Sequence, residues 1–160
     1  WLWGQDFAWQ WGFVLESKGL WSLVLCRTLD RARHRTLDLK LALWKGQRLC
    51  RVFTHREIQV EQTGYLRRKR VTKYPRVMAL VAPEPTTDVP RASDLAARSG
   101  GDEVRCRFHS DDLAQVVIPN ETDLDSTLVN QVVGRAELEG RIAGEALNLE
   151  GQGVFEFLTA

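Results

Sequence analysis

Large apolar residues occupy odd positions at the start of the chain, and this period of two constrains the fold more than any other feature. The odd positions carry Trp1, Trp3, Phe7, Trp9, Trp11, Phe13 and Leu15. The even positions from 6 to 16 are small or polar: Asp6, Ala8, Gln10, Gly12, Val14 and Glu16. Such alternation predicts a β-strand with one large apolar face. We expect that face to line a deep core or a cavity for a flat apolar molecule.

The rest of the chain has the pattern of short strands separated by turns. We predict strands over 20–28, 37–44, 48–55, 57–61, 77–82, 103–109, 113–118 and 127–133, followed by glycine-punctuated pieces up to residue 158. Residues 83–102 contain three prolines and are predicted to form a long surface loop, in which Ser93 could cap one helical turn. About eight to ten strands with at most one short helix predict an all-β antiparallel barrel or strongly curved sandwich.

Composition limits the class of protein. The 160 residues fit a single domain, and a net charge of +1 argues against a nucleic-acid partner. No apolar run reaches the ~20 residues of a transmembrane helix. Three widely spaced cysteines (Cys26, Cys50 and Cys106) suggest a reducing, cytoplasmic location. No zinc spacing, nucleophile elbow or phosphate-binding glycine loop is present, so we predict no metal and no cofactor.

Both ends of the chain resemble a known family. The opening carries Trp9-x-Trp11-Gly12-Phe13-x-Leu15, Gly19 and Leu20-x-x-Leu23-x-Leu25-x-Arg27. The tail carries Thr127-x-x-Asn130-x-x-x-Gly134, Gly140-x-x-x-Gly144 and Gly151-x-Gly153-x-x-Glu156-Phe157. These spacings resemble the C-terminal barrel of the carotenoid 1,2-hydratase-like (hydroxyneurosporene synthase-like) proteins.

The resemblance implies a lipocalin-like barrel that works beside a second barrel, in the same polypeptide or in a homodimer. Members of that family hydrate carotenoid double bonds, or cyclise and isomerise polyketide and terpenoid intermediates. Their hydratases carry a His-x-Trp-Gly motif and an acidic aspartate. Here Trp3-Gly4 matches the end of the motif, but Trp1 replaces its histidine. Asp30 is the counterpart of the acid, without a tyrosine two residues before it.

Three hypotheses follow from these patterns. The first is a domain that binds a hydrophobic small molecule (terpenoid, carotenoid or polyketide-like) in an aromatic-lined cavity. The second is a hydratase, cyclase or isomerase, whose general acid must be a carboxylic acid kept neutral by apolar surroundings. The third is a structural or interaction barrel with a filled core. The candidate catalytic residues are Asp6, Asp30 and Glu156. The candidate ligand-binding residues are Trp3, Trp9, Trp11, Trp21, Trp44 and Phe155.

Overall fold

A computed structural model describes residues 7–30, 32–66, 89–119 and 126–159. These residues form nine antiparallel strands in one sheet and a single 3₁₀ turn, which confirms the all-β class. The elements are β1 (Phe7–Glu16), β2 (Trp21–Asp30), β3 (Thr36–Lys45), β4 (Arg48–Thr54), η1 (His55–Glu57), β5 (Ile58–Tyr65), β6 (Pro90–Ser99), β7 (Asp102–Pro119), β8 (Ser126–Ile142) and β9 (Glu145–Thr159).

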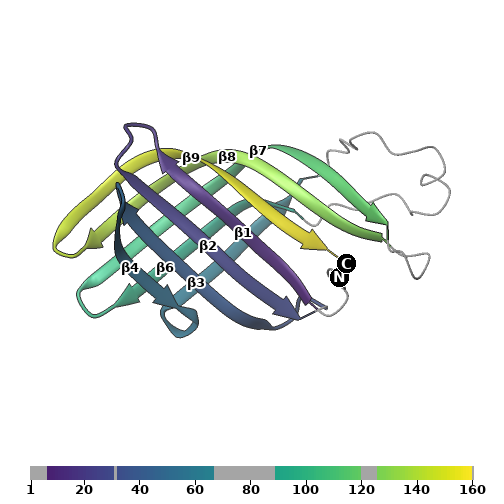
Figure 1. The fold of residues 1–160 in the computed structure, drawn as a ribbon, viewed down its shortest axis with the longest axis horizontal. Helices are drawn as coiled ribbons and strands as arrows, with labels where there is room; N and C mark the ends of the chain where they lie inside the picture. The colour runs from purple at the N-terminus through teal and green to yellow at the C-terminus, as the bar shows by residue number, and fades with distance from the viewer. Residues whose placement is uncertain (1–6, 31, 67–88, 120–125, 160) are drawn as a thin grey trace.

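The strands form an up-and-down meander, and the sheet curls into a barrel. The barrel is open, because no backbone hydrogen bonds join the two edge strands in the part of the chain that the structure describes. The strand order is β4-β3-β2-β1-β9-β8-β7-β6-β5, so the first and last strands pair and β4 and β5 are the two edges. Figure 1 shows β1, β2 and β3 lying in front of β6 and β7. The chain therefore surrounds one interior, as a lipocalin-like barrel does.

Charged side chains bridge the seam where the ladder is open. From β4, Arg51 places its Nη2 3.8 Å from a Glu57 oxygen and its Nε 3.6 Å from a carboxylate oxygen of Asp102, the first residue of β7. Asp102 also accepts a 2.7 Å hydrogen bond from the backbone N–H of Ala143. The edge at β4 is thus held to the β6–β7 and β8–β9 turns by side chains.

Large side chains fill the middle of the barrel. The ring centroids of Phe108 and Phe155 lie 4.5 Å apart, and both belong to one core cluster that also contains Phe53 and many leucines and valines. Close packing there depends on glycine, because a Cβ on Gly134 would lie 2.7 Å from Cζ of Phe108. This part of the interior is a packed core.

Two expectations from the sequence need correction. The aromatic positions of β1 face outward: Phe7, Trp11 and Leu15 are 38%, 43% and 53% exposed, whereas Ala8 and Val14 are buried. The inner volume is already occupied by rings from β4, β7 and β9, so β1 can present only small side chains inward.

The predicted loop over 83–102 is the second correction. Residues 90–99 are strand β6, paired with β5 and β7, and Ser93 is an extended, buried residue of that strand and not a helix cap. Residues 83–88, the predicted strand 77–82, Trp1, Trp3 and Asp6 lie outside the described residues. None of the helical segments that the structure describes could cross a membrane.

Candidate functional site

The inner face of the barrel changes from apolar to polar towards the end where β1 begins and β7 and β9 stop, at the right in Figure 1. Inward positions near that end carry amide, hydroxyl and guanidinium groups: Gln10, Arg27, Thr36, Gln62, Ser93, Gln115 and Asn130. Apolar side chains are interspersed with them: Ala8, Leu29, Val89, Leu113, Val132 and Phe157. We call this region the polar end. Apolar and polar side chains mixed in this way would suit a molecule that is mostly apolar and carries a polar group.

A pair of amides crosses the interior at the polar end. Gln62 Nε2 on β5 donates to Gln10 Oε1 on β1 over 3.3 Å, and the reverse bond, from Gln10 Nε2 to Gln62 Oε1, is 3.5 Å long. β1 and β5 are not neighbours in the sheet, so the two side chains meet across the barrel. Both bonds are at the long limit for N–H···O geometry. A ligand atom could therefore replace either bond at little cost.

Arg27 joins this pair from the neighbouring strand. It stands opposite Gln10 in the β1–β2 register, and its Nη1 donates to Gln10 Oε1 over 3.3 Å. Its Nε donates over 3.0 Å to the hydroxyl of Thr36. On the same face of β2, Leu23, Leu25 and Leu29 are almost fully buried. A guanidinium thus follows a run of leucines on the inner face.

The electrostatics of Arg27 are unusual for an inward-facing cation. Burial lowers the pKa of its guanidinium, although arginine still stays protonated at neutral pH. Within residues 7–30, 32–66, 89–119 and 126–159, no carboxylate forms an ion pair or hydrogen bond with it. A half-buried charge with only neutral partners is costly unless something else compensates it.

Two further amides lie deeper in the same region. Gln115 and Asn130 are 0% and 1% exposed, and Gln115 Nε2 donates to Asn130 Oδ1 over 2.7 Å. Asn130 Nδ2 in turn donates to the backbone carbonyl of Phe157 on β9, over 3.3 Å. These bonds tie β7, β8 and β9 together at the polar end and fix the orientation of both amides.

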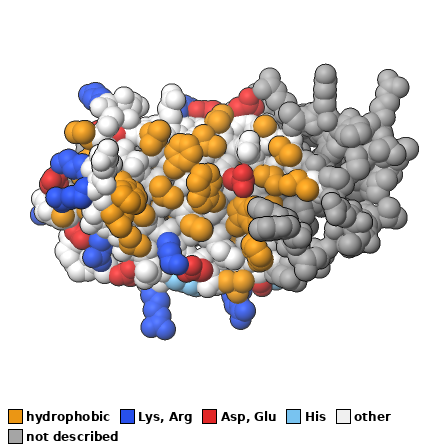
Figure 2. Space-filling view, in the orientation of Figure 1, with side chains coloured by type: hydrophobic (Ala, Val, Ile, Leu, Met, Phe, Trp, Pro, Cys, Tyr) orange, Lys and Arg blue, Asp and Glu red, His pale blue; other side chains and the backbone are white. Residues whose placement is uncertain are grey.

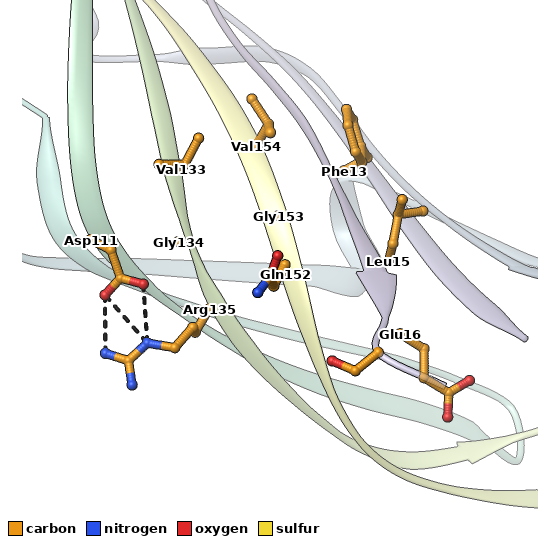
Figure 3. A pocket seen from close by; sticks show the side chains of 11 residues that line it. Phe13, Leu15, Glu16, Asp111, Val133, Gly134, Arg135, Gln152, Gly153 and Val154 are labelled. Carbon is orange, nitrogen blue, oxygen red and sulfur yellow. Dashed lines mark hydrogen bonds and ion pairs between the residues drawn. The ribbon is translucent and has the colours of Figure 1, made fainter. Parts of the chain in front are cut away.

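The outer face carries a second candidate surface, a groove of about 620 Å³ over β1, β9 and β8. Figure 3 shows Phe13, Leu15, Val133 and Val154 along it, with the side chains of Asp111 and Arg135 pointing toward one another at one side. That ion pair is bidentate, with Arg135 Nε 3.0 Å from Oδ2 and Nη2 3.0 Å from Oδ1 of Asp111. The hydrogen bonds from Arg135 lower the pKa of the Asp111 carboxyl.

This groove continues into the outward aromatic residues of β1. Figure 2 shows hydrophobic side chains gathered over the middle of the face that carries β1, β2 and β9. On the outer side of the sheet, exposed large apolar side chains come from β1, β7 and β8: Phe7, Trp11, Leu15, Val116, Ile118 and Val133. We call these six residues the outer apolar stripe. Large exposed apolar side chains on one face of a sheet are typical of interaction sites.

The predicted ligand-binding residues are spread over the barrel. Trp9 and Trp11 are on the outer face, and Trp44 is half-buried beside Ser22 in the β2–β3 register. Trp21 packs against the core at the end opposite the polar end, with Lys45 Nζ 5.5 Å from its ring. Phe155 is 2% exposed within the core. Trp3 is outside the described residues. That these residues bind a ligand stays a prediction.

The predicted catalytic acids also lie in different parts of the barrel. Glu156 lies on the outer face, where Trp9 Nε1 donates to its Oε1 over 2.9 Å. Asp30 ends β2, and its Oδ1 accepts the backbone N–H groups of His34 (2.7 Å) and Arg35 (3.0 Å). The hydrogen bond from Arg35 is the main reason that the pKa of Asp30 is lowered. Asp6 is not among the described residues, so a catalytic role for any of the three stays a prediction.

The polar end was not predicted from the sequence. One signal was present: Arg27 shares a face with Leu23, Leu25 and Leu29, and a charged residue on a leucine face is unexpected in a buried strand. No local sequence pattern indicates that Gln10 and Gln62 meet, since that contact depends on how the whole sheet curls. Within the part of the chain that the structure describes, no cluster of His, Cys, Asp or Glu could hold a metal ion.

Comparison with known proteins relates the chain to others by fold. No family profile and no curated protein matches its sequence. The crystal structure of CghA with Sch210972 superposes with a TM-score of 0.58 at 14% identity, covering 99% of this chain and 42% of that one. Kievitone hydratase from Nectria haematococca gives a TM-score of 0.50 at 12% identity, covering 97% of this chain and 40% of that one. The chain thus spans about two fifths of the length of each, and shares their fold.

Proposed function

We propose that this chain binds a hydrophobic small molecule that bears a polar group, with that group held at the polar end of the barrel. The supporting observation is the placement of half-buried Gln10, Gln62 and Arg27 on an inner face that is otherwise apolar. CghA, whose structure shares this fold, was crystallised with a small molecule, which supports the use of this kind of barrel for binding. Terpenoid, carotenoid and polyketide-like skeletons are the ligand classes that we propose.

Binding of farnesol, followed by isothermal titration calorimetry, tests this proposal. Gln62 is on an edge strand and half-buried, so Gln62→Phe places a ring at the polar end with little disturbance of the core. We expect saturable binding to the wild type, a loss of at least about tenfold in Gln62→Phe, and no change in the matched outer-face variant Trp11→Ala. Loss of binding in Trp11→Ala but not in Gln62→Phe would show that the ligand binds in the outer groove. Failure of the wild type to bind would overturn the proposal.

The outer apolar stripe supports a second proposal, that it docks on a second lipocalin-like barrel. More than half of CghA and of kievitone hydratase lies outside the region matched here, which is enough chain for another barrel of this size. An exposed face containing Trp11 and Phe7 has the aromatic composition of interface cores. Sedimentation analysis of the isolated chain should then show self-association that Trp11→Gln together with Leu15→Gln abolishes. A concentration-independent monomer would contradict docking on a second copy of this chain.

The enzymatic alternative, a hydratase, cyclase or isomerase with a buried carboxylic acid, has less support. Asp30 has a lowered pKa and accepts backbone N–H groups, the opposite of what a neutral general acid needs. Glu156 accepts the Trp9 indole on the outer face. That the chain belongs to the carotenoid 1,2-hydratase-like family is likewise a proposal, which rests on the sequence resemblance alone.

A further inference from the structure

Arg27 has unused hydrogen-bonding capacity at the polar end. A guanidinium carries five N–H donors, and the described contacts of Arg27 use Nε towards Thr36 and Nη1 towards Gln10. The second of these bonds is long, at 3.3 Å. The remaining N–H groups and the weakly held Nη1 are available to a ligand on the inner face.

The half-buried charge of Arg27 favours an anionic ligand. A guanidinium that is half-buried beside leucines loses hydration, and amide and hydroxyl oxygens only partly replace it. By contrast, Arg51 has Glu57 and Asp102 as counter-charges at the seam, and Arg135 has Asp111 on the outer face. The described part of the chain therefore leaves one inward cation without a counter-charge.

We propose, on the basis of the proposed small-molecule site, that Arg27 binds the carboxylate of an amphipathic organic acid with an apolar skeleton. The planar fork of arginine matches two such oxygens. Gln10 and Gln62 then act as neighbouring donors, because each has an Nε2 whose present bond is at the long limit and can turn to the ligand. Thr36 holds Nε and so fixes the plane of the guanidinium.

Matched acid and alcohol pairs test this assignment. Farnesoate and farnesol, and dodecanoate and dodecan-1-ol, differ only in the head group, and calorimetry gives both affinities on the full chain. We expect the wild type to bind each acid at least about tenfold more tightly than its alcohol, since a hydrogen bond to a charged group is stronger than one to a neutral group. Arg27→Met keeps the volume and should erase that preference, because it weakens binding of the acids much more than binding of the alcohols.

Two controls make the result specific. Arg141 is exposed on β8, so Arg141→Met removes the same charge from the outside and should keep the acid preference. Arg27→Lys keeps the charge but loses the fork, so it should keep a reduced preference. Thermal unfolding of each variant verifies that the barrel is intact.

The outcomes separate the two proposals. An acid preference that persists in Arg27→Met, or acids and alcohols that bind equally to the wild type, would overturn the role of Arg27 while leaving the small-molecule site in place. Failure of all four probes to bind would overturn the binding function and the role of Arg27 with it.

Discussion

The ring of Phe155 on β9 occupies the space that a side chain at Gly12 on β1 would need. The two residues are directly paired in the β1–β9 register, and a Cβ added to Gly12 would lie 2.5 Å from Cγ of Phe155 and 2.6 Å from the carbonyl oxygen of Val154. A methyl group cannot be accommodated at that distance without moving the ring or the strand. The inward side chains of β1 are small because the inward side chains of β9, such as Phe155, fill the neighbouring space.

The change Gly12→Ala should therefore destabilise the protein strongly. Overpacking a filled core costs about 1–3 kcal/mol, and we expect at least about 2 kcal/mol here because backbone as well as ring is in contact. Urea unfolding measures the difference. In the matched control Gly101→Ala the new methyl meets no atom within 4 Å, so that variant should unfold near the wild type. Equal unfolding of the two variants would contradict the packing described.

This packing explains which part of the β1 prediction succeeded. Alternation over residues 7–16 predicts a strand correctly, because a period of two is a property of the strand itself. It does not determine which face is buried, since that depends on the residues supplied by other strands. Phe53, Phe108 and Phe155 come from three of those strands and fill the interior, and the large face of β1 turns outward.

Strand β6 shows the opposite limit of local pattern. Pro90 and the small residues after it are typical of loops, and the sequence therefore predicted one. Pro90 stands at the first position of the strand, where a missing N–H is tolerated, and Leu95 and Ala97 face the core. Pairing with β5 and β7 outweighs low strand propensity here. The polar end escaped prediction for the same reason, because Gln10 and Gln62 are 52 positions apart.

The outward orientation of the aromatic side chains of β1 leads to a second stability prediction. Phe155→Ala removes a ring that contacts Phe108 in the core, and such truncations cost about 3–5 kcal/mol. Trp11→Ala removes a ring that is 43% exposed on the outer face, and should cost about 1 kcal/mol or less in a monomer. Guanidinium unfolding compares the two. A larger loss of unfolding free energy in Trp11→Ala than in Phe155→Ala would show that the aromatic face of β1 belongs to the core.

Thiol reactivity provides a third prediction that reports burial directly. Burial raises the pKa of the Cys106 thiol to about 12, so almost none of it is thiolate at neutral pH, whereas Cys26 is exposed on the outer face. Iodoacetamide should label Cys26 in the native protein and Cys106 only after unfolding, as read by peptide mass spectrometry. In Cys26→Ser, native labelling at residue 106 should stay absent. Rapid labelling of Cys106 would show that the interior opens to solvent.

Asp30 gives a prediction that depends on pH. Its folded pKa is lowered, first by the hydrogen bond from Arg35, so ionisation of this carboxyl favours the folded state. The stabilisation is present above the unfolded pKa, about 3.9, and disappears as the pH falls through the lower folded value. Unfolding free energies of the wild type and Asp30→Asn should therefore differ above about pH 5 and converge in stronger acid.

Carboxyl NMR of the folded protein would test the same point at the residue itself. The titration midpoint of Asp30 should lie below the ordinary aspartate value and should largely keep that position in about 0.5 M salt, because adjacent N–H donors are screened far less than distant charges. A midpoint above the ordinary value would mean that the carboxyl is neutral over a wider range. That result would restore Asp30 as the acid of a hydratase or cyclase, since proton donation to an alkene requires the protonated form.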